Sequence, residues 1–219
     1  MTTVSEAIKK RHSARAFTDR DVDIDTVKSI IQIAKQSPSG VNTQPWNVYV
    51  LSGDARDKLV NEATSRYDQG KMDGQEYLVY PKEMPDWYKE RRRAVGWAMY
   101  GAIGIEKGDT EKMMAQGRKN YEFFGAPVGI FITVKNCVGP NGWGHVGHFI
   151  QNVCLLAIEN GLATCLQEAW AELPKLVREH VDYPEDETLW CGIALGYEDE
   201  TDPVNQFRTE REDLENFSK

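Results

Sequence analysis

The sequence lacks the features that mark several common protein classes. It has no uninterrupted apolar run of about 18 residues, so we predict no membrane span. Its N-terminus, MTTVSEAIKK, has no apolar signal core, which favours a cytoplasmic protein. Positive charge is scarce, since 26 Lys and Arg stand against 34 Asp and Glu, for a net charge of −8. Because phosphate backbones require a basic surface, we expect no nucleic-acid partner.

Cysteine is sparse too, and its four positions form no C-x-x-C pair. This spacing argues against a disulfide framework and a structural metal. His145 and His148 form H-x-x-H within GWGHVGHF, but no acidic or cysteine ligand follows at a familiar interval. We therefore expect no metal, and we interpret these histidines as residues of the core or of an active site.

Several catalytic and nucleotide-binding motifs are also missing. There is no G-x-S-x-G turn, and no cysteine lies in an evidently electropositive setting, so a nucleophilic triad has little support. Neither a P-loop nor a G-x-G-x-x-G turn occurs, which disfavours nucleotide binding by a glycine-rich loop.

The pattern of apolar residues predicts helices that alternate with strands. The 219 residues suffice for one large domain or two small ones. Apolar spacing predicts helices over 3–10, 23–36, 55–66, 146–161 and 174–180. It predicts strands over 46–53 and 127–134, after Gly161, and over 189–197. Four or five strands in alternation with helices indicate an α/β arrangement with one sheet.

Two segments differ in composition and periodicity from the rest of the chain. Residues 67–109 combine glycine, proline and many large aromatics without a steady period, which favours a partly helical excursion packed over something flat. The alternative is a poorly ordered surface insertion. Residues 198–219 form a polar tail that carries Phe207 and Phe217, as if it wraps a neighbour.

Positive charge gathers near the start of the chain, in RHSARAF at residues 11–17. One explanation is the solvated end of a helix, where basic residues are favoured. The other is a bound anion, such as a cofactor phosphate. Further polar donors occur in SPSGVNTQPW and in NQFRTER.

Four of these stretches together resemble the FMN-dependent nitroreductase family, most closely its nitrobenzoate-reductase-like branch. They are RHSARAF, SPSGVNTQPWNVYVL, QNVCLLAIENGLAT and GIALGYEDETDPVNQFRTER, in family order over nearly the whole chain. The resemblance implies an α+β fold around a mostly antiparallel sheet flanked by helices. It also implies one domain over 1–219, with a lid at about 67–109 and a C-terminal arm at about 198–219. The chain would form an intertwined homodimer with FMN at the subunit interface.

The resemblance implies a flavoenzyme as well. Hydride would pass from NADH or NADPH through FMN to a nitroaromatic or quinone-like acceptor by a ping-pong mechanism, with small aromatic acceptors as partners. Catalysis would rest on stacking, orientation and electrostatics. The alternatives are an ene or quinone reductase, a reductive dehalogenase, and a flavin-binding protein without activity.

Roles for the basic residues follow from the same resemblance. Arg11 and Arg208 would grip the FMN phosphate, with Arg211 a weaker candidate at a solvated rim. His12 and Ser13 would bind phosphate or ribityl oxygens through backbone or side chain. Arg15 would lie near N1 and O2 of the flavin and stabilise the charge added on reduction, which is a catalytic role.

The remaining expected contacts are with the flavin ring and the substrate. Asn42 would reach the pyrimidine edge with support from Gln44, and Pro38, Ser39 and Gly40 would cover the ring from the partner subunit. The backbone N–H groups of Glu168 and Ala169 would face flavin N5 and O4, although many relatives have glycine at the second position. The aromatic residues expected to line the substrate space are Tyr80, Trp87, Tyr88 and Trp97.

Overall fold

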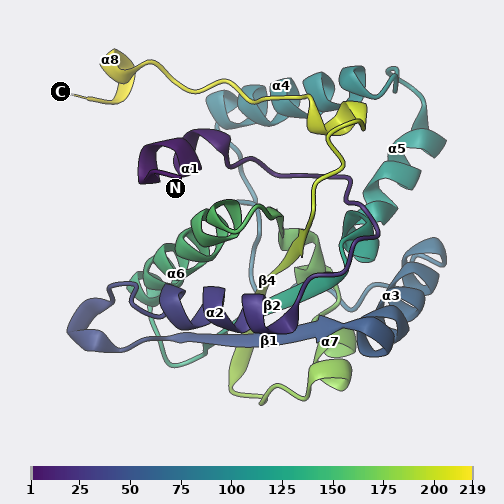
Figure 1. Cartoon of the computed structure of the whole chain (residues 1–219). Helices are drawn as coiled ribbons and strands as arrows, with labels where there is room; N and C mark the ends of the chain where they lie inside the picture. Colours follow the sequence, from purple (N-terminus) through teal and green to yellow (C-terminus); the bar gives the residue numbers. More distant parts are fainter. Residues whose placement is uncertain (1, 219) are drawn as a thin grey trace.

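A computed structural model describes residues 2–218 of the chain (Figure 1). Its centre is one four-stranded sheet in the order β1-β2-β4-β3. The strands are β1 (Trp46–Ser52), β2 (Val128–Lys135), β3 (Ala163–Gln167) and β4 (Glu187–Gly196). All three neighbouring pairs are antiparallel, which confirms the α+β fold. The α/β arrangement inferred from alternation is wrong, because the order of elements along a chain does not fix the direction in which each strand enters the sheet.

Helices flank the sheet, and the predicted ones are present with shifted ends. They are α1 (Val4–Lys10), α2 (Ile24–Ala34), α3 (Gly53–Asp68), α6 (Pro140–Glu159) and α7 (Pro174–Val181). Helix α6 begins six residues earlier than predicted, with Pro140 in its first turn, where proline is tolerated. Within residues 2–218, no helix combines the length and the apolar character needed to cross a membrane.

The aromatic segment and its surroundings supply the other elements. The segment is partly helical, as predicted, because it contains α4 (Asp86–Ala102). The sequence did not predict α5 (Thr110–Arg118) or the short C-terminal α8 (Leu214–Phe217). Four 3-10 turns complete the chain, and they are η1 (Gly40–Asn42), η2 (Lys119–Gly125), η3 (Glu168–Glu172) and η4 (Pro203–Asn205).

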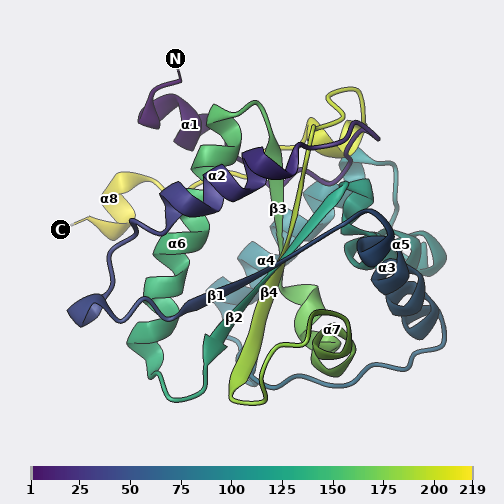
Figure 2. The ribbon, with the colours of Figure 1, turned by 60° about the horizontal axis from the view of Figure 1, so that its bottom comes forward.

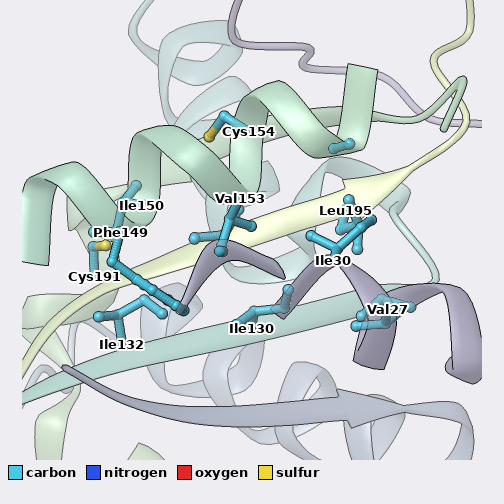
Figure 3. Close-up of a cluster of buried hydrophobic side chains, with 14 of the residues drawn as sticks. Val27, Ile30, Ile130, Ile132, Phe149, Ile150, Val153, Cys154, Cys191 and Leu195 are labelled. Carbon is cyan, nitrogen blue, oxygen red and sulfur yellow. The ribbon is translucent and has the colours of Figure 1, made fainter. Parts of the chain in front are cut away.

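The sheet separates two hydrophobic clusters. Figure 2 shows α2 and α6 on one side of the strands and α3 and α7 on the other. Ile130 and Ile132 of β2 point toward α2 and α6, where they pack with Val27, Phe149 and Val153 (Figure 3). Phe131, between the two isoleucines, belongs to the cluster on the opposite face. This alternation is the period of two that a strand imposes on its side chains.

A bulge interrupts the alternation in β4. Ile132 pairs with Cys191, but the next residue, Thr133, pairs with Leu189, so Trp190 is left without a partner in the ladder. Cys191 and Leu189 consequently face different clusters although they are two residues apart. Bulges of this kind re-aim side chains and are common beside active sites. Here the bulge re-aims Trp190.

The basic segment RHSARAF is extended rather than helical. Helix α1 ends at Lys10, and the segment then runs beside β3, where Ser13 forms a parallel bridge with Thr164. The N–H of Ala14 donates to the carbonyl of Thr164 at 3.0 Å. The explanation by a helix end fits Arg11, which is the C-cap residue of α1 and whose N–H donates to the carbonyl of Ala7. It does not fit Arg15, which lies beyond the helix on an extended segment fixed to the sheet edge.

Candidate active site

A segment near the N-terminus and a segment near the C-terminus are joined by one buried side chain, that of Asn205. Its Oδ1 accepts the backbone N–H of Arg15 at 2.7 Å. Its Nδ2 donates to the carbonyls of Ala16 and Asp199, both at 2.8 Å. The guanidinium of Arg208 in turn donates to the backbone carbonyl of Asn205. The N-terminal basic segment and the C-terminal arginine thus share one attachment point.

Three arginines in this region have no carboxylate partner. Within residues 2–218, no carboxylate oxygen lies within 4.0 Å of a guanidinium nitrogen of Arg11, Arg15 or Arg208. The arginines that do form such pairs are Arg56, Arg66, Arg91, Arg118 and Arg178. The guanidinium of Arg15 donates locally, from Nη1 to the carbonyl of Ser13 at 3.2 Å. The chain has 34 acidic residues, and still these three guanidinium groups lack a carboxylate partner among the described residues. A guanidinium presents several N–H donors in one plane, which suits the oxygens of a phosphate.

His12 differs from its basic neighbours because its ring is fully engaged. Nε2 lies 2.8 Å from a carboxylate oxygen of Glu198, and Nδ1 lies 3.1 Å from the carbonyl of Lys10. Both ring nitrogens are thus occupied by contacts within the chain. The part of His12 that is left for a cofactor is its backbone.

The buried thiols near this segment are not nucleophiles. Burial raises the pKa of Cys165 to about 11, although the positive charge of Arg15 opposes the rise. Burial also raises the pKa of Cys154 and Cys191. All three thiols therefore stay protonated near neutral pH, and the charge of the arginines remains available to an external anion.

A second set of predicted residues forms the loop between α2 and β1. Asn42 N–H donates to the carbonyl of Ser39 at 3.0 Å, and Gln44 N–H donates to its hydroxyl, also at 3.0 Å. Val41, Asn42 and Gln44 all have positive φ, an unusual conformation for residues other than glycine. Val41 is nevertheless 97% exposed. A strained loop that displays an apolar tip is typical of a functional contact surface.

Glu168 and Ala169 lie at the third part of the site, where β3 gives way to η3. The start of a helical turn leaves backbone N–H groups without intrahelical partners. Both residues line a cavity of about 650 Å³ with Tyr80 and the re-aimed Trp190. Desolvation raises the pKa of the Glu168 carboxyl. The position of these residues is compatible with backbone donation to a flat ligand.

Within a single chain, only one of the four predicted substrate residues lines the cavity. Tyr80 is on the cavity wall. Trp87, Tyr88 and Trp97 are on α4 and are not among the residues that line the cavity. Trp87 and Trp97 are exposed, and the ring of Tyr88 packs on Trp87 with centroids 5.5 Å apart.

Helix α6 separates the loop from the cavity. The loop is bonded to His145, His148 and Asn152 of α6. The cavity is lined by the α6 residues Gly147, Ile150 and Gln151. At 3.6 residues per turn, each trio shares a face and the two faces are about opposite. In one chain, residues 38–44 and Glu168 therefore do not come together.

Comparison with known proteins identifies the family of the chain. The family model "Nitroreductase family" matches residues 8–197. The chain belongs to the nitroreductase family. A 4-nitrobenzoate reductase of Nocardioides sp. (strain LMS-CY) is 35% identical over 95% of this chain and 85% of that protein. A second 4-nitrobenzoate reductase, from Pseudomonas putida, is 31% identical over 96% and 92%. These relatives confirm the predicted branch of the family.

Solved structures of nitroreductases share the whole fold of this nitroreductase. The FMN and NADPH-dependent nitroreductase NfnB from Sphigopyxis sp. strain HMH has a TM-score of 0.93 at 38% identity, over 98% of this chain and 97% of that one. NfnB from Mycobacterium smegmatis, solved with NADPH, also has a TM-score of 0.93, at 28% identity over 98% and 96%.

Sequence reasoning missed several residues in and around the candidate site. Asn205 lies in a quoted motif, but its only sequence signal is a polar residue beside Val204 in a polar tail, which does not indicate burial. Tyr77 donates its hydroxyl to the carbonyl of Trp190 at 2.5 Å, and burial raises the pKa of that hydroxyl. Gln167 is buried on the cavity wall and donates to the carbonyl of Asn120 at 2.6 Å. No local pattern marks these contacts, because each joins segments far apart in the sequence.

The junction at Asn205 yields a prediction about stability. Asn205→Ala removes three hydrogen bonds and leaves the N–H of Arg15 without a partner, while the carbonyls of Ala16 and Asp199 keep only their bonds from the N–H groups of Asp199 and Asp202. The free energy of unfolding should therefore fall by about 2–3 kcal/mol in urea titrations. Asn216→Ala is the matched control, because Asn216 is exposed and should change stability by less than about 0.5 kcal/mol. Equal stability of the two variants would contradict the assigned role.

Proposed function

We propose that this member of the nitroreductase family is an FMN-dependent oxidoreductase that passes hydride equivalents from NADPH or NADH to nitroaromatic acceptors. The observation that carries the proposal is the group of uncompensated arginines, Arg11, Arg15 and Arg208, at the junction of the chain ends. The relatives named above act on nitrobenzoate or depend on FMN and NADPH, which supports the same conclusion. When bound, FMN supplies the chemistry, because it takes two electrons from the dinucleotide and gives them to the acceptor.

The arginines divide the work between binding and tuning. Arg11 and Arg208 hold the phosphate dianion with charge-assisted hydrogen bonds, and Ser13 and the backbone of His12 add donors along the ribityl chain. Arg15 is fixed through its own backbone by Asn205, so its guanidinium is a preorganised positive charge. We assign to Arg15 the stabilisation of the negative charge that reduction adds at N1 and O2.

The backbone and the cavity orient the donor and the acceptor. The N–H groups of Glu168 and Ala169 bind the ring edge at N5 and O4. The donor and the acceptor use the space beside Tyr80 in turn, which gives ping-pong kinetics. Tyr77 anchors the start of the 67–109 segment to Trp190, so this segment acts as a lid over that space. Trp87, Tyr88 and Trp97 of α4 are then available to complete the wall.

The site needs a second copy of the chain. Asn42 and Gln44 for the pyrimidine edge, and Pro38, Ser39 and Gly40 for the ring face, lie on the far side of α6 from Glu168. A homodimer in which each loop reaches the partner's cavity brings the two sets together. Residues 207–213 of the C-terminal arm lie along α4 (Figure 1), and Phe217 beyond them is exposed and available for contact with the partner.

The test of function uses colour and electron acceptors. The purified protein should be yellow, lose its colour when NADPH or NADH is added without oxygen, and regain it with 4-nitrobenzoate or nitrobenzene. A quinone, an enone and a halogenated phenol are the comparison acceptors, and faster reoxidation by any of these would reassign the substrate class. A colourless protein would refute the proposal. Bound flavin that neither dinucleotide bleaches would indicate a binding protein without activity.

The division of labour between arginines is a separate prediction. Arg208→Ala should raise the dissociation constant of FMN at least about tenfold, because it removes charge-assisted bonds to phosphate. Arg15→Ala should instead lower the flavin reduction potential and slow reduction by NADPH, with a smaller effect on affinity. Flavin titration and stopped-flow reduction measure the two effects, and Arg118→Ala, whose guanidinium pairs with Asp68, is the control. Similar losses of affinity and rate in both variants would count against these roles.

The two-chain site predicts complementation between inactive variants. Differently tagged chains that carry Arg15→Ala and Asn42→Ala are co-expressed, and the heterodimer is purified through both tags. If Arg15 and Asn42 of one site come from different chains, one of the two sites is intact and about half of the wild-type activity returns. If both residues of a site come from one chain, each site keeps a defect and the heterodimer stays as inactive as its parents.

A further inference from the structure

The H-x-x-H pair has no place in the flavin contacts described above, yet both rings are directed at the flavin loop. His145 and His148 lie one turn apart on α6, with ring centroids 6.2 Å apart. His145 Nε2 lies 3.2 Å from the N–H of Gly40, and His148 Nδ1 lies 3.3 Å from the carbonyl of Pro38. Figure 2 shows the loop after α2 beside the first half of α6. Within residues 2–218, no group of three or more ligating side chains forms a metal site.

The loop requires outside support because of its backbone conformation. Val41 and Gln44 have φ of 44° and Asn42 has φ of 57°, so three residues with side chains lie in the left-handed region. Such a conformation persists only where its surroundings determine it. The bonds of Ser39 to Asn42 and Gln44 close the turn on itself. They do not fix the turn to the rest of the protein.

Three bonds to α6 supply that fixation. Asn152 Nδ2 donates to the hydroxyl of Ser37 at 2.6 Å, at the base of the loop. The two histidines bind further along, at Pro38 and Gly40. These are two of the residues assigned to the partner's flavin ring, so the histidines hold the part of the loop that faces the cofactor.

The partners of the two rings fix where their protons lie. A backbone N–H only donates, so His145 Nε2 must accept and be unprotonated, and the neutral ring carries its proton on Nδ1. A carbonyl only accepts, so His148 Nδ1 must donate. The two histidines are thus not equivalent, and only His145 depends on being neutral.

The fit between His145 and Gly40 is also tight. A Cβ atom added at Gly40 would lie 3.1 Å from His145 Cε1 and 3.5 Å from Nε2. A side chain at this position would therefore press on the ring that accepts the Gly40 N–H. The glycine and the histidine form a matched pair.

We propose that His145 and His148 are positioning residues of the flavin site, which hold Pro38 and Gly40 of their own chain in the shape that covers the flavin of the partner subunit. The inference rests on the proposed function, because it assigns the loop to FMN. His145 is the main support, since it accepts the backbone N–H of Gly40, the residue directly before the left-handed Val41 and Asn42. His148 is the weaker support, because it binds Pro38, which lies further from the left-handed residues, at 3.3 Å.

Flavin affinity measured on the dimer tests the proposal. His145→Phe should raise the dissociation constant of FMN about tenfold, which corresponds to one lost hydrogen bond and a displaced loop. His145→Gln should recover most of the affinity, because its amide oxygen can accept the Gly40 N–H at a similar reach. His180→Phe is the matched control, because the ring of His180 pairs with Glu62 on α3. Thermal unfolding of each apoprotein separates loss of affinity from loss of fold.

A spectroscopic measurement checks the proton positions independently of affinity. Nitrogen NMR of the wild-type holoprotein at pH 8 should show His145 with Nδ1 protonated and Nε2 free of a proton. A His145 ring protonated on Nε2 would overturn the proposal, as would FMN affinity in His145→Phe equal to that of wild type. Because both measurements start from a wild-type protein that binds FMN, a wild-type protein that binds none would refute the proposed function instead.

Discussion

Helix α6 imposes the constraint on which the whole site depends. One face of the helix carries His145, His148 and Asn152, which bind the loop at 37–40, and the other face borders the cavity at Glu168. The helix is also a central part of the core, since Phe149, Val153 and Ala157 are buried against the sheet. It therefore cannot move aside to let the two sets of residues meet. A cofactor that needs both sets has to be bound between two chains.

The surface of the single chain is consistent with the same constraint. Helix α4 has 17 residues, and none of them is buried in the chain as described. Trp87, Val95 and Trp97 are exposed on it, although a helix in a folded protein usually buries an apolar stripe. Val41 at the tip of the loop and Phe217 in the C-terminal arm are exposed as well. These elements leave apolar side chains exposed in the single chain. We assign to them the contacts with the partner, its flavin or the substrate.

The sequence predicts the chemistry of the site better than its geometry. RHSARAF and NQFRTER each contain an arginine without a carboxylate partner, Arg15 and Arg208, that the structure attaches to Asn205. The residue types alone left a bound anion as one of two explanations for the charge. The strands and most helices follow from apolar spacing. Strand direction does not follow, because alternation of elements is compatible with parallel and antiparallel sheets alike. The bulge at Trp190 is equally invisible, since it arises from the register between β2 and β4 rather than from a local pattern.

The residues that sequence reasoning missed share one physical property, which is that they bind backbone at long sequence separation. Asn205 holds Arg15 across 190 positions, Tyr77 reaches Trp190 across 113, and His145 reaches Gly40 across 105. Backbone groups are the same at every position, so nothing in the sequence near Gly40 or Arg15 indicates which side chain satisfies them. A sequence motif contains the residues expected to touch a cofactor. The residues that hold the motif in position are recognised only in the folded chain. On the proposed function, Asn205 orients Arg15 and Arg208, and the two histidines hold the loop, so that two separated motifs become parts of one site.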